Sequence, residues 1–125
     1  MIKKFDGAQW NGVKKDVYKD EPGTWQGVAK HVLASSLNAQ HETRVFEFSP
    51  GGYSSHEHHE HEHSVLILEG SGEVLIEGAW TQVQVLDFIH VGPNVVHQFR
   101  AGESGMKIVC IVDRERDKPI LVPNE

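Results

Sequence analysis

Cysteine, long apolar runs and clustered basic residues are all scarce in this chain of 125 residues. Its single cysteine, Cys110, excludes an internal disulfide, a composition typical of the reducing cytoplasm. No apolar stretch has the length of a membrane span or the placement of a secretory signal. The net charge of -6, with scattered Lys and Arg residues, argues against nucleic acid as a partner. We therefore expect a cytoplasmic protein that binds neither membranes nor nucleic acid.

Short strand-like segments recur along the chain, separated by turns rich in glycine and proline. The predicted segments are residues 28–33, 43–48, 64–68, 72–77, 80–85, 87–91, 96–100 and 107–112. Regular short strands indicate an antiparallel all-β sandwich or barrel. The chain length suits one domain with one core. We expect a single domain over residues 1–125, with its core at about 24–113, a lead-in at 1–23 that can add an edge strand, and an extended arm at 114–125.

The most informative stretch is residues 51–70, GGYSSHEHHEHEHSVLILEG, which holds five of the nine histidines. Because side chains alternate along a strand, the odd-numbered residues from 57 to 63 share one face with Val65 and Ile67. The even-numbered residues fall on the other face, so the whole run cannot serve one ion. The pattern therefore predicts a metal site on one face of this segment.

The spacing within this stretch resembles the first motif of the cupin family. That motif normally reads Gly, five residues, His, one, His, three or four, Glu, six, Gly. Here the corresponding positions hold Gly51, Glu57, His59, His63 and Gly70, so a Glu and a His have exchanged places. The family's set of three histidines and one glutamate is kept if a second motif supplies one more histidine.

Residues 86–101, LDFIHVGPNVVHQFRA, resemble the second cupin motif, whose histidine falls on His97. Three landmarks of that motif differ: Leu86 stands for its first Gly, Pro93 is shifted by one position, and Ala101 replaces its Asn. Together the motifs and their apolar flanks cover roughly residues 43–113. The segment TWQGVAKHVL also resembles the leading strands of small single-domain cupins of the cupin 2 type.

This resemblance implies a fold and a cofactor. The fold would be a single cupin-type antiparallel β-barrel, also called a jelly roll or double-stranded β-helix. The cofactor would be one divalent transition metal per chain, Mn, Fe, Ni, Co or Zn, held by Glu57, His59, His63 and His97. Such a donor set leaves octahedral positions open to a small molecule. Open-edged antiparallel barrels often cover their edges by pairing, so we also expect a homodimer.

Two other interpretations of the histidine run stay open. An alternative register uses His56, His58, Glu62 and His97 as ligands, although it places the flanking glycines less well. A solvated histidine-rich loop that binds metal loosely is the second. An expression tag is excluded because the run is internal and leads into an apolar strand.

No catalytic residue can be assigned from the sequence, but two candidates stand out. Arg44, in a predicted strand, could face the barrel interior and hold an anionic substrate. His90 could support a metal ligand or transfer protons. Cys110 lies in an apolar strand, where a buried inert thiol is expected.

The expected function is that of a small metal-binding cupin that acts as a mononuclear divalent-metal enzyme on a small oxygen-rich organic molecule. Both a dioxygenase-like and an isomerase-like reaction fit this description, because the metal can bind substrate oxygens in either case. The alternative is a non-catalytic binding module for a small polar ligand or a metal, used in sensing or storage. A third hypothesis is a degenerate barrel without metal. Cupin barrels serve all of these purposes, so the fold does not choose among them.

Overall fold

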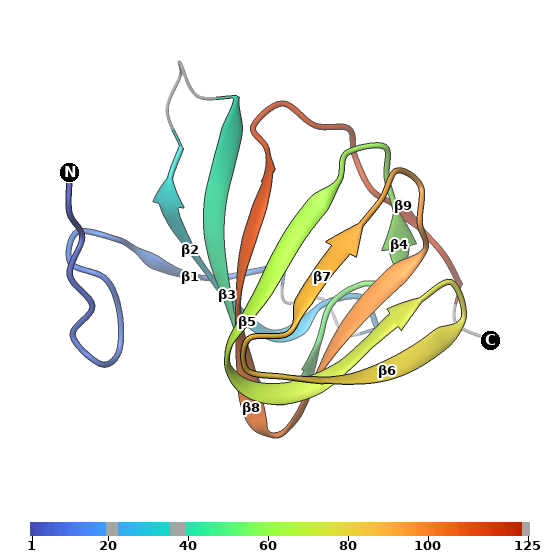
Figure 1. The fold of residues 1–125 in the computed structure, drawn as a ribbon, viewed down its shortest axis with the longest axis horizontal. Helices are drawn as coiled ribbons and strands as arrows, with labels where there is room; N and C mark the ends of the chain where they lie inside the picture. Colours follow the sequence, from blue (N-terminus) through green and yellow to red (C-terminus); the bar gives the residue numbers. More distant parts are fainter. Residues whose placement is uncertain (20–22, 36–39, 124–125) are drawn as a thin grey trace.

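The computed structural model describes residues 1–19, 23–35 and 40–123, and these form nine strands and no helix (Figure 1). The strands are β1 (Lys15–Val17), β2 (Gln26–Ala34), β3 (His41–Tyr53), β4 (Glu57–His58), β5 (His63–Ile76), β6 (Ala79–Gln84), β7 (Phe88–Val91), β8 (His97–Asp113) and β9 (Ile120–Leu121). Every strand pair is antiparallel. The all-β antiparallel barrel expected from the sequence is thus confirmed. None of the described residues belongs to a helix able to span a membrane.

Two long strands, β5 and β8, hold the barrel together because each runs through both of its halves (Figure 1). One half of β8 pairs with both β3 and β5, and its other half continues along β5 toward β4. Shorter strands complete the fold: β2 and β1 extend the side of β3, while β6 and β7 both pair with β5. The result is a barrel whose interior receives side chains from strands far apart in the sequence.

The glycine-rich segments near residues 70 and 105 are bends within strands and not the chain reversals that the sequence predicted. The segments expected at 64–68 and 72–77 join as β5, and those at 96–100 and 107–112 join as β8. Gly70 has a φ of 75°, and a Cβ placed there would clash with the carbonyl oxygen of Gly105. Glycine lets the two strands approach and bend together here.

The core follows the period-two pattern of the strands. Val65 and Ile67 of β5 are buried, whereas Leu68 is 36% exposed. Aromatic side chains fill the space between the strands, with Tyr18 packed edge-on against both Trp25 and Phe46. The remaining core residues are Val28, Phe48, Val74, Val83, Phe99, Ala101, Met106, Ile108, Cys110 and Val112.

Both terminal segments pack on the barrel of their own chain. The lead-in supplies β1, which pairs with β2. After β8 the arm crosses one end of the barrel, drawn in red in Figure 1, and places β9 beside β4. The arm covers the end of the barrel where the histidine run lies.

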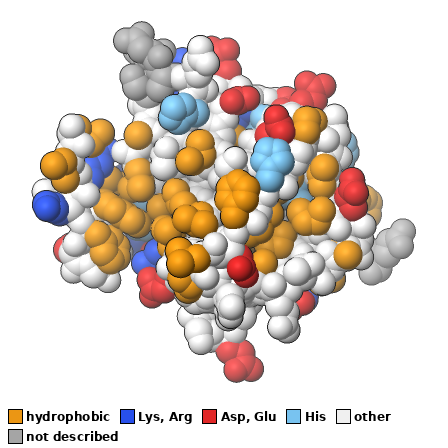
Figure 2. All heavy atoms as spheres, viewed as in Figure 1, with side chains coloured by type: hydrophobic (Ala, Val, Ile, Leu, Met, Phe, Trp, Pro, Cys, Tyr) orange, Lys and Arg blue, Asp and Glu red, His pale blue; other side chains and the backbone are white. Residues whose placement is uncertain are grey.

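The outer surface carries apolar side chains over the central strands, as the space-filling view shows (Figure 2). Leu68, Phe88 and Ile111 are among the exposed large apolar residues. Acidic and histidine side chains also appear on this face.

Candidate metal centre

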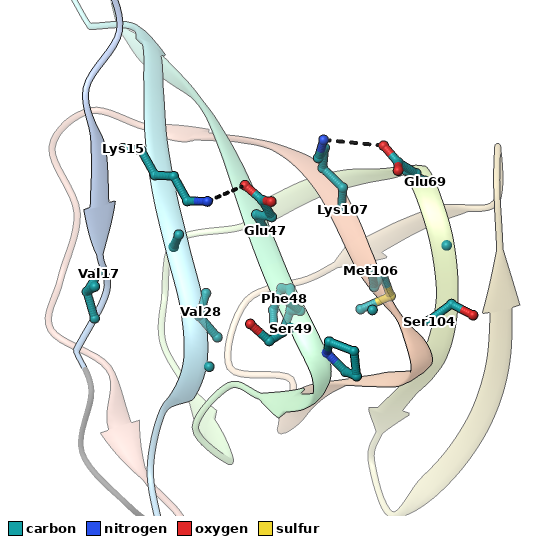
Figure 3. A pocket seen from close by; sticks show the side chains of 15 residues that line it. Lys15, Val17, Val28, Glu47, Phe48, Ser49, Glu69, Ser104, Met106 and Lys107 are labelled. Carbon is teal, nitrogen blue, oxygen red and sulfur yellow. Dashed lines mark ion pairs between the residues drawn. The ribbon is translucent and has the colours of Figure 1, made fainter. Parts of the chain in front are cut away.

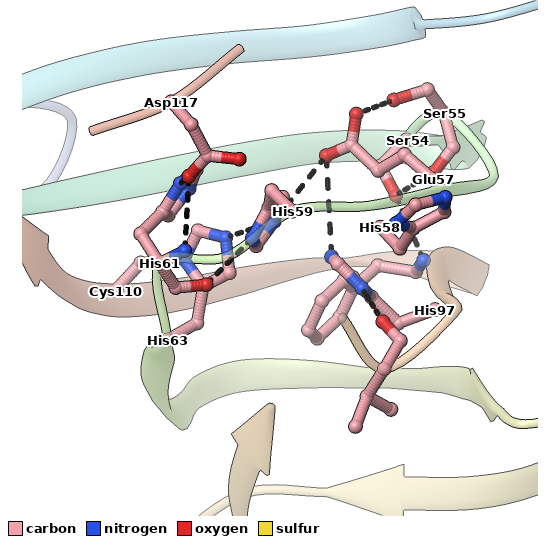
Figure 4. A network of polar contacts seen from close by, with 12 residues as sticks. Ser54, Ser55, Glu57, His58, His59, His61, His63, His97, Cys110 and Asp117 are labelled. Carbon is pink, nitrogen blue, oxygen red and sulfur yellow. Dashed lines mark hydrogen bonds and ion pairs between the residues drawn. The ribbon is translucent and has the colours of Figure 1, made fainter. Parts of the chain in front are cut away.

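Three histidines from two separate parts of the chain meet inside the barrel. His59 follows β4, His63 begins β5, and His97 begins β8. Each offers a ring nitrogen, and these atoms lie within 4.8 Å of one another. The Nε2 atoms of His59 and His63 are 2.9 Å apart (Figure 4). This geometry suits imidazole ligands that share one ion.

Backbone carbonyls fix the orientation of two of these rings. The Nδ1 of His59 is 2.6 Å from the carbonyl oxygen of His61, and the Nδ1 of His97 is 2.8 Å from that of Val95. A carbonyl oxygen can only accept, so each Nδ1 carries the proton and donates it. Each Nε2 therefore presents a lone pair to the centre, as a metal ligand must.

The third ring, His63, has a thiol as its partner. Its Nδ1 lies 3.0 Å from the Cys110 sulfur. Because His59 presents a lone pair, the contact between the two Nε2 atoms requires His63 to donate from Nε2, and its Nδ1 then accepts from the thiol. Binding a cation through Nε2 requires the opposite tautomer, with Nδ1 donating to the sulfur. Cys110 can take both roles, so its contact is compatible with a ligand role for His63.

Burial keeps the three imidazoles neutral. It lowers the pKa of His59 and of His97, and it lowers the pKa of His63 to about 2, with further lowering from nearby His59 and Arg44. Burial also raises the pKa of the Cys110 thiol, which stays protonated. Neutral imidazole is the form that binds a divalent metal.

Glu57 brings a carboxylate to the same centre. Its Oε2 accepts a hydrogen bond of 2.6 Å from the Ser55 hydroxyl. Its Oε1 lies 3.9 Å from the Nε2 of His59 and 4.0 Å from that of His97 (Figure 4). The side chain is buried beside the three rings. Three imidazoles and one carboxylate fit a divalent first-row metal, so the residues present suit the cofactor that the resemblance implies.

The structure gives Glu62 and His58, two residues of the alternative register, other partners. Glu62 lies at the surface and pairs with His90, at 2.8 Å between Oε1 and Nε2. The Nδ1 of His58 is 3.4 Å from the Oδ1 of Asn94. His90 is half-exposed and lies outside the cavity beside the histidine cluster, so the structure gives it no contact with the centre.

A cavity of about 380 Å³ opens beside the cluster. Glu57, His63 and His97 contribute to its lining, and so does Arg44, which is 4% exposed. Its aromatic wall consists of Tyr18, Trp25, Phe46, Phe48 and Phe99. A cavity that combines an aromatic wall with converging polar and charged groups is typical of a small-molecule site.

A larger groove of about 550 Å³ runs across β1, β2, β3, β8 and β5 (Figure 3). Ion pairs join Lys15 to Glu47 at 3.4 Å and Lys107 to Glu69 at 3.3 Å. Its described lining contains neither histidine nor cysteine. His63 and His97 of the cluster line the smaller cavity instead.

The arm after β8 contacts the centre through Asp117. Its carboxylate accepts hydrogen bonds from the backbone N–H groups of Glu60 and His61, at 2.8 and 3.0 Å, and from the Nδ1 of His61 at 2.8 Å. The His61 ring stacks on that of His59, with centroids 3.6 Å apart. Asp117 therefore ties the arm to the loop that carries a cluster histidine.

Replacing Asp117 with asparagine is expected to loosen this loop. The N–H of Glu60 and the His61 ring hold the pKa of the Asp117 carboxyl well below its usual range. A lowered pKa contributes stability above the ordinary value of about 4 and loses it as the pH falls further. The melting-temperature difference between wild type and Asp117→Asn should be full at neutral pH and shrink below about pH 4. Glu115→Gln, on the same arm, is the control; an equal difference for both variants would contradict the assignment.

Sequence reasoning missed three contacts of this centre. Ser55 could have been found, because it shares strand parity with Glu57. The contact of Cys110 with His63 joins strands that are distant in the sequence, and Asp117 belongs to an arm with no local pattern that points to a partner.

Fold and site together define the class of antiparallel β-barrels with an interior histidine cluster. Residues 44–112 match the cupin domain family, and the chain belongs to that family. The chain is 37% identical over 115 residues to the 1-methylthio-D-xylulose 5-phosphate methylsulfurylase of Rhodospirillum rubrum, covering 90% of this chain and 74% of that protein.

Two crystal structures resemble the whole barrel. A cupin-2 domain from Rhodospirillum rubrum has a TM-score of 0.87 at 38% identity, covering 94% of this chain and 80% of that one. A cupin 2 conserved barrel domain protein from Rhodopseudomonas palustris has a TM-score of 0.90 at 32% identity, covering 97% and 86%. These likenesses confirm the fold and the family that the sequence motifs indicated.

Proposed function

We propose that this protein is a mononuclear divalent-metal enzyme that acts on a small, oxygen-rich organic molecule. The observation that carries the proposal is the convergence of three neutral imidazoles and the Glu57 carboxylate beside a cavity. His59, His63, His97 and Glu57 would hold the metal. A bound divalent ion supplies Lewis-acid polarisation of substrate oxygens and can also bind dioxygen if it is redox-active.

The chain's own residues would position the substrate and exclude water. The aromatic wall can pack against the carbon skeleton, and Arg44 offers a buried cation to an anionic substituent. The Cys110 thiol and the Nδ1 of His63 can exchange donor and acceptor roles, as described above. That pair can hold a proton beside the centre while His63 keeps its orientation.

The curated relative favours catalysis over storage or sensing. It is named as a methylsulfurylase of a phosphorylated ketose, 1-methylthio-D-xylulose 5-phosphate. A ketose phosphate is small and rich in oxygen, so this compound is the first substrate to test. The non-catalytic binding module remains the alternative, and it predicts binding without turnover.

The test compares metal-loaded with metal-stripped protein. Consumption of 1-methylthio-D-xylulose 5-phosphate is followed by phosphorus NMR, with dioxygen and a small thiol each included or left out. We expect consumption only by the metal-loaded protein. Oxygen-dependent consumption would indicate the dioxygenase-like reaction, and oxygen-independent consumption the isomerase-like or transfer reaction. Equal rates with and without metal would contradict the proposal.

We also propose that the protein is a cytoplasmic homodimer. The open sheet edge at β1 and the exposed apolar residues Leu68, Phe88 and Ile111 support self-association. Light scattering on the purified protein tests the dimer, and a monomer mass at micromolar concentration would contradict it.

A further inference from the structure

The cavity beside the histidine cluster has a strongly cationic wall. Its described lining includes the cationic residues Lys19, Arg44, Arg114, Arg116 and Lys118. Two carboxylates share that described lining, Glu57 and Asp117. Positive charge therefore exceeds negative charge around this cavity, although the chain as a whole carries a net charge of -6.

Both carboxylates of the lining already have other partners. Glu57 accepts from Ser55 and faces the ring nitrogens of the cluster. Asp117 accepts from the backbone of the loop and from the His61 ring. Neither forms an ion pair with Arg44, Arg116 or Lys118 among the described residues, so the carboxylates of the lining do not neutralise these three cations.

Arg44 shows that this charge is incompletely satisfied within the protein. Its guanidinium is buried, and its Nε has no hydrogen-bond partner among the described residues. One Nη2 contact, of 3.5 Å, goes to the Cys110 sulfur, which is a weak acceptor. The nearest carboxylate oxygen, Oε1 of Glu42, is 3.7 Å from Nε and also lies 3.4 Å from Nη2 of Arg116. One carboxylate thus serves two guanidinium groups.

A buried guanidinium with so few acceptors is costly unless an anion completes its partners. We propose that Arg44, Arg116 and Lys118 form a subsite for the phosphate group of a small phosphate monoester. Phosphate suits this wall better than a single carboxylate, because it carries nearly two charges and offers several acceptor oxygens.

The subsite lies next to the metal centre. Cys110 links the two, since its sulfur is 3.5 Å from Nη2 of Arg44 and 3.0 Å from Nδ1 of His63. A cavity of about 380 Å³ can therefore hold a molecule with its phosphate at the arginines and its other oxygens toward the histidines. The placement of the other oxygens toward the histidines rests on the proposed function. The inference adds the residues that bind the anionic end of the molecule.

Binding of inorganic phosphate and D-xylulose 5-phosphate, with D-xylulose for comparison, tests the subsite by titration calorimetry. The protein is first stripped of metal and dialysed free of chelator, because a bound metal would itself attract phosphate. Loss of the charged hydrogen bonds in Arg44→Gln should weaken phosphate binding about ten- to a hundredfold. The more exposed variants Arg116→Gln and Lys118→Gln should weaken it roughly two- to fivefold each.

The matched control is Arg100→Gln, since Arg100 is an exposed arginine that pairs with Glu73 outside the cavity. It should leave phosphate affinity unchanged. Thermal melts verify folding, and the double variant of Arg116 and Lys118 decides the question if Arg44→Gln does not fold. Unchanged affinity in the cavity variants, equal losses in Arg100→Gln, or acetate binding as tight as phosphate would each overturn the subsite.

This experiment separates the subsite from the proposed enzyme. Phosphate binding with the expected pattern in a protein that never takes up metal would leave the subsite standing and remove the metal-dependent function. Metal-dependent turnover, together with a phosphate affinity that none of the three cavity variants changes, would support the enzyme and remove the subsite.

Discussion

Replacing His97 with alanine is expected to empty the metal centre and abolish metal-dependent activity. The variant removes one of three converging ring nitrogens. Mutating a residue that only supports a metal ligand weakens metal affinity by up to about a hundredfold, so loss of a direct ligand should weaken it by more than that. Elemental analysis of protein purified without tag or chelator should fall from about one transition metal per chain to almost none. Turnover should fall in parallel.

His90→Ala is the control for this variant. Its ring is 50% exposed and pairs with Glu62 at the surface, so metal content should stay at the wild-type level. Thermal melts of both variants confirm that the barrel is intact. Full metal retention in a folded His97→Ala protein would show that His97 is not a ligand.

The same measurement distinguishes the two registers of the histidine run. Glu57→Ala should lower metal affinity, because its carboxylate faces two of the cluster nitrogens. Glu62→Ala should not, because that carboxylate lies outside with His90. The opposite pattern would move the site to the alternative register of His56, His58 and Glu62.

Truncating Ile67 to alanine is expected to cause the largest loss of stability. Its side chain is 0% exposed in the centre of β5, so the change removes buried apolar surface and leaves a cavity. Such substitutions cost about 2–5 kcal/mol of unfolding free energy. Denaturant unfolding monitored by tryptophan fluorescence measures the difference.

Leu68→Ala is the matched control on the adjacent residue. Leu68 faces outward and is 36% exposed, so its truncation should cost less than about 1 kcal/mol. Equal losses at the two positions would mean that β5 does not present alternate faces to core and solvent.

Period-two alternation explains why much of the barrel could be predicted. Val65 and Ile67 are apolar at every second position, and the strand places both in the core. The bends at Gly70 and Gly105 could not be recognised, because a glycine-rich segment is compatible with a reversal or a bend. Only the pairing of β5 with β8 on both sides of these glycines distinguishes the two.

The sequence by itself predicted Glu57, His59 and His63 as candidate donors, because they stand at odd positions of a segment expected to be extended. The structure interrupts that segment, since β4 ends at His58 and β5 begins at His63. Tertiary structure decided the rest. His97 reaches the others because β8 pairs with β4 and β5 in one register, in which His97 lies opposite Glu57 and Ile76. Local side-chain patterns set which face of a strand a residue occupies, whereas contacts between distant segments depend on how the whole sheet closes. For the same reason, the sequence alone could not predict the contact of Asp117 with the loop or the sharing of one carboxylate by two arginines.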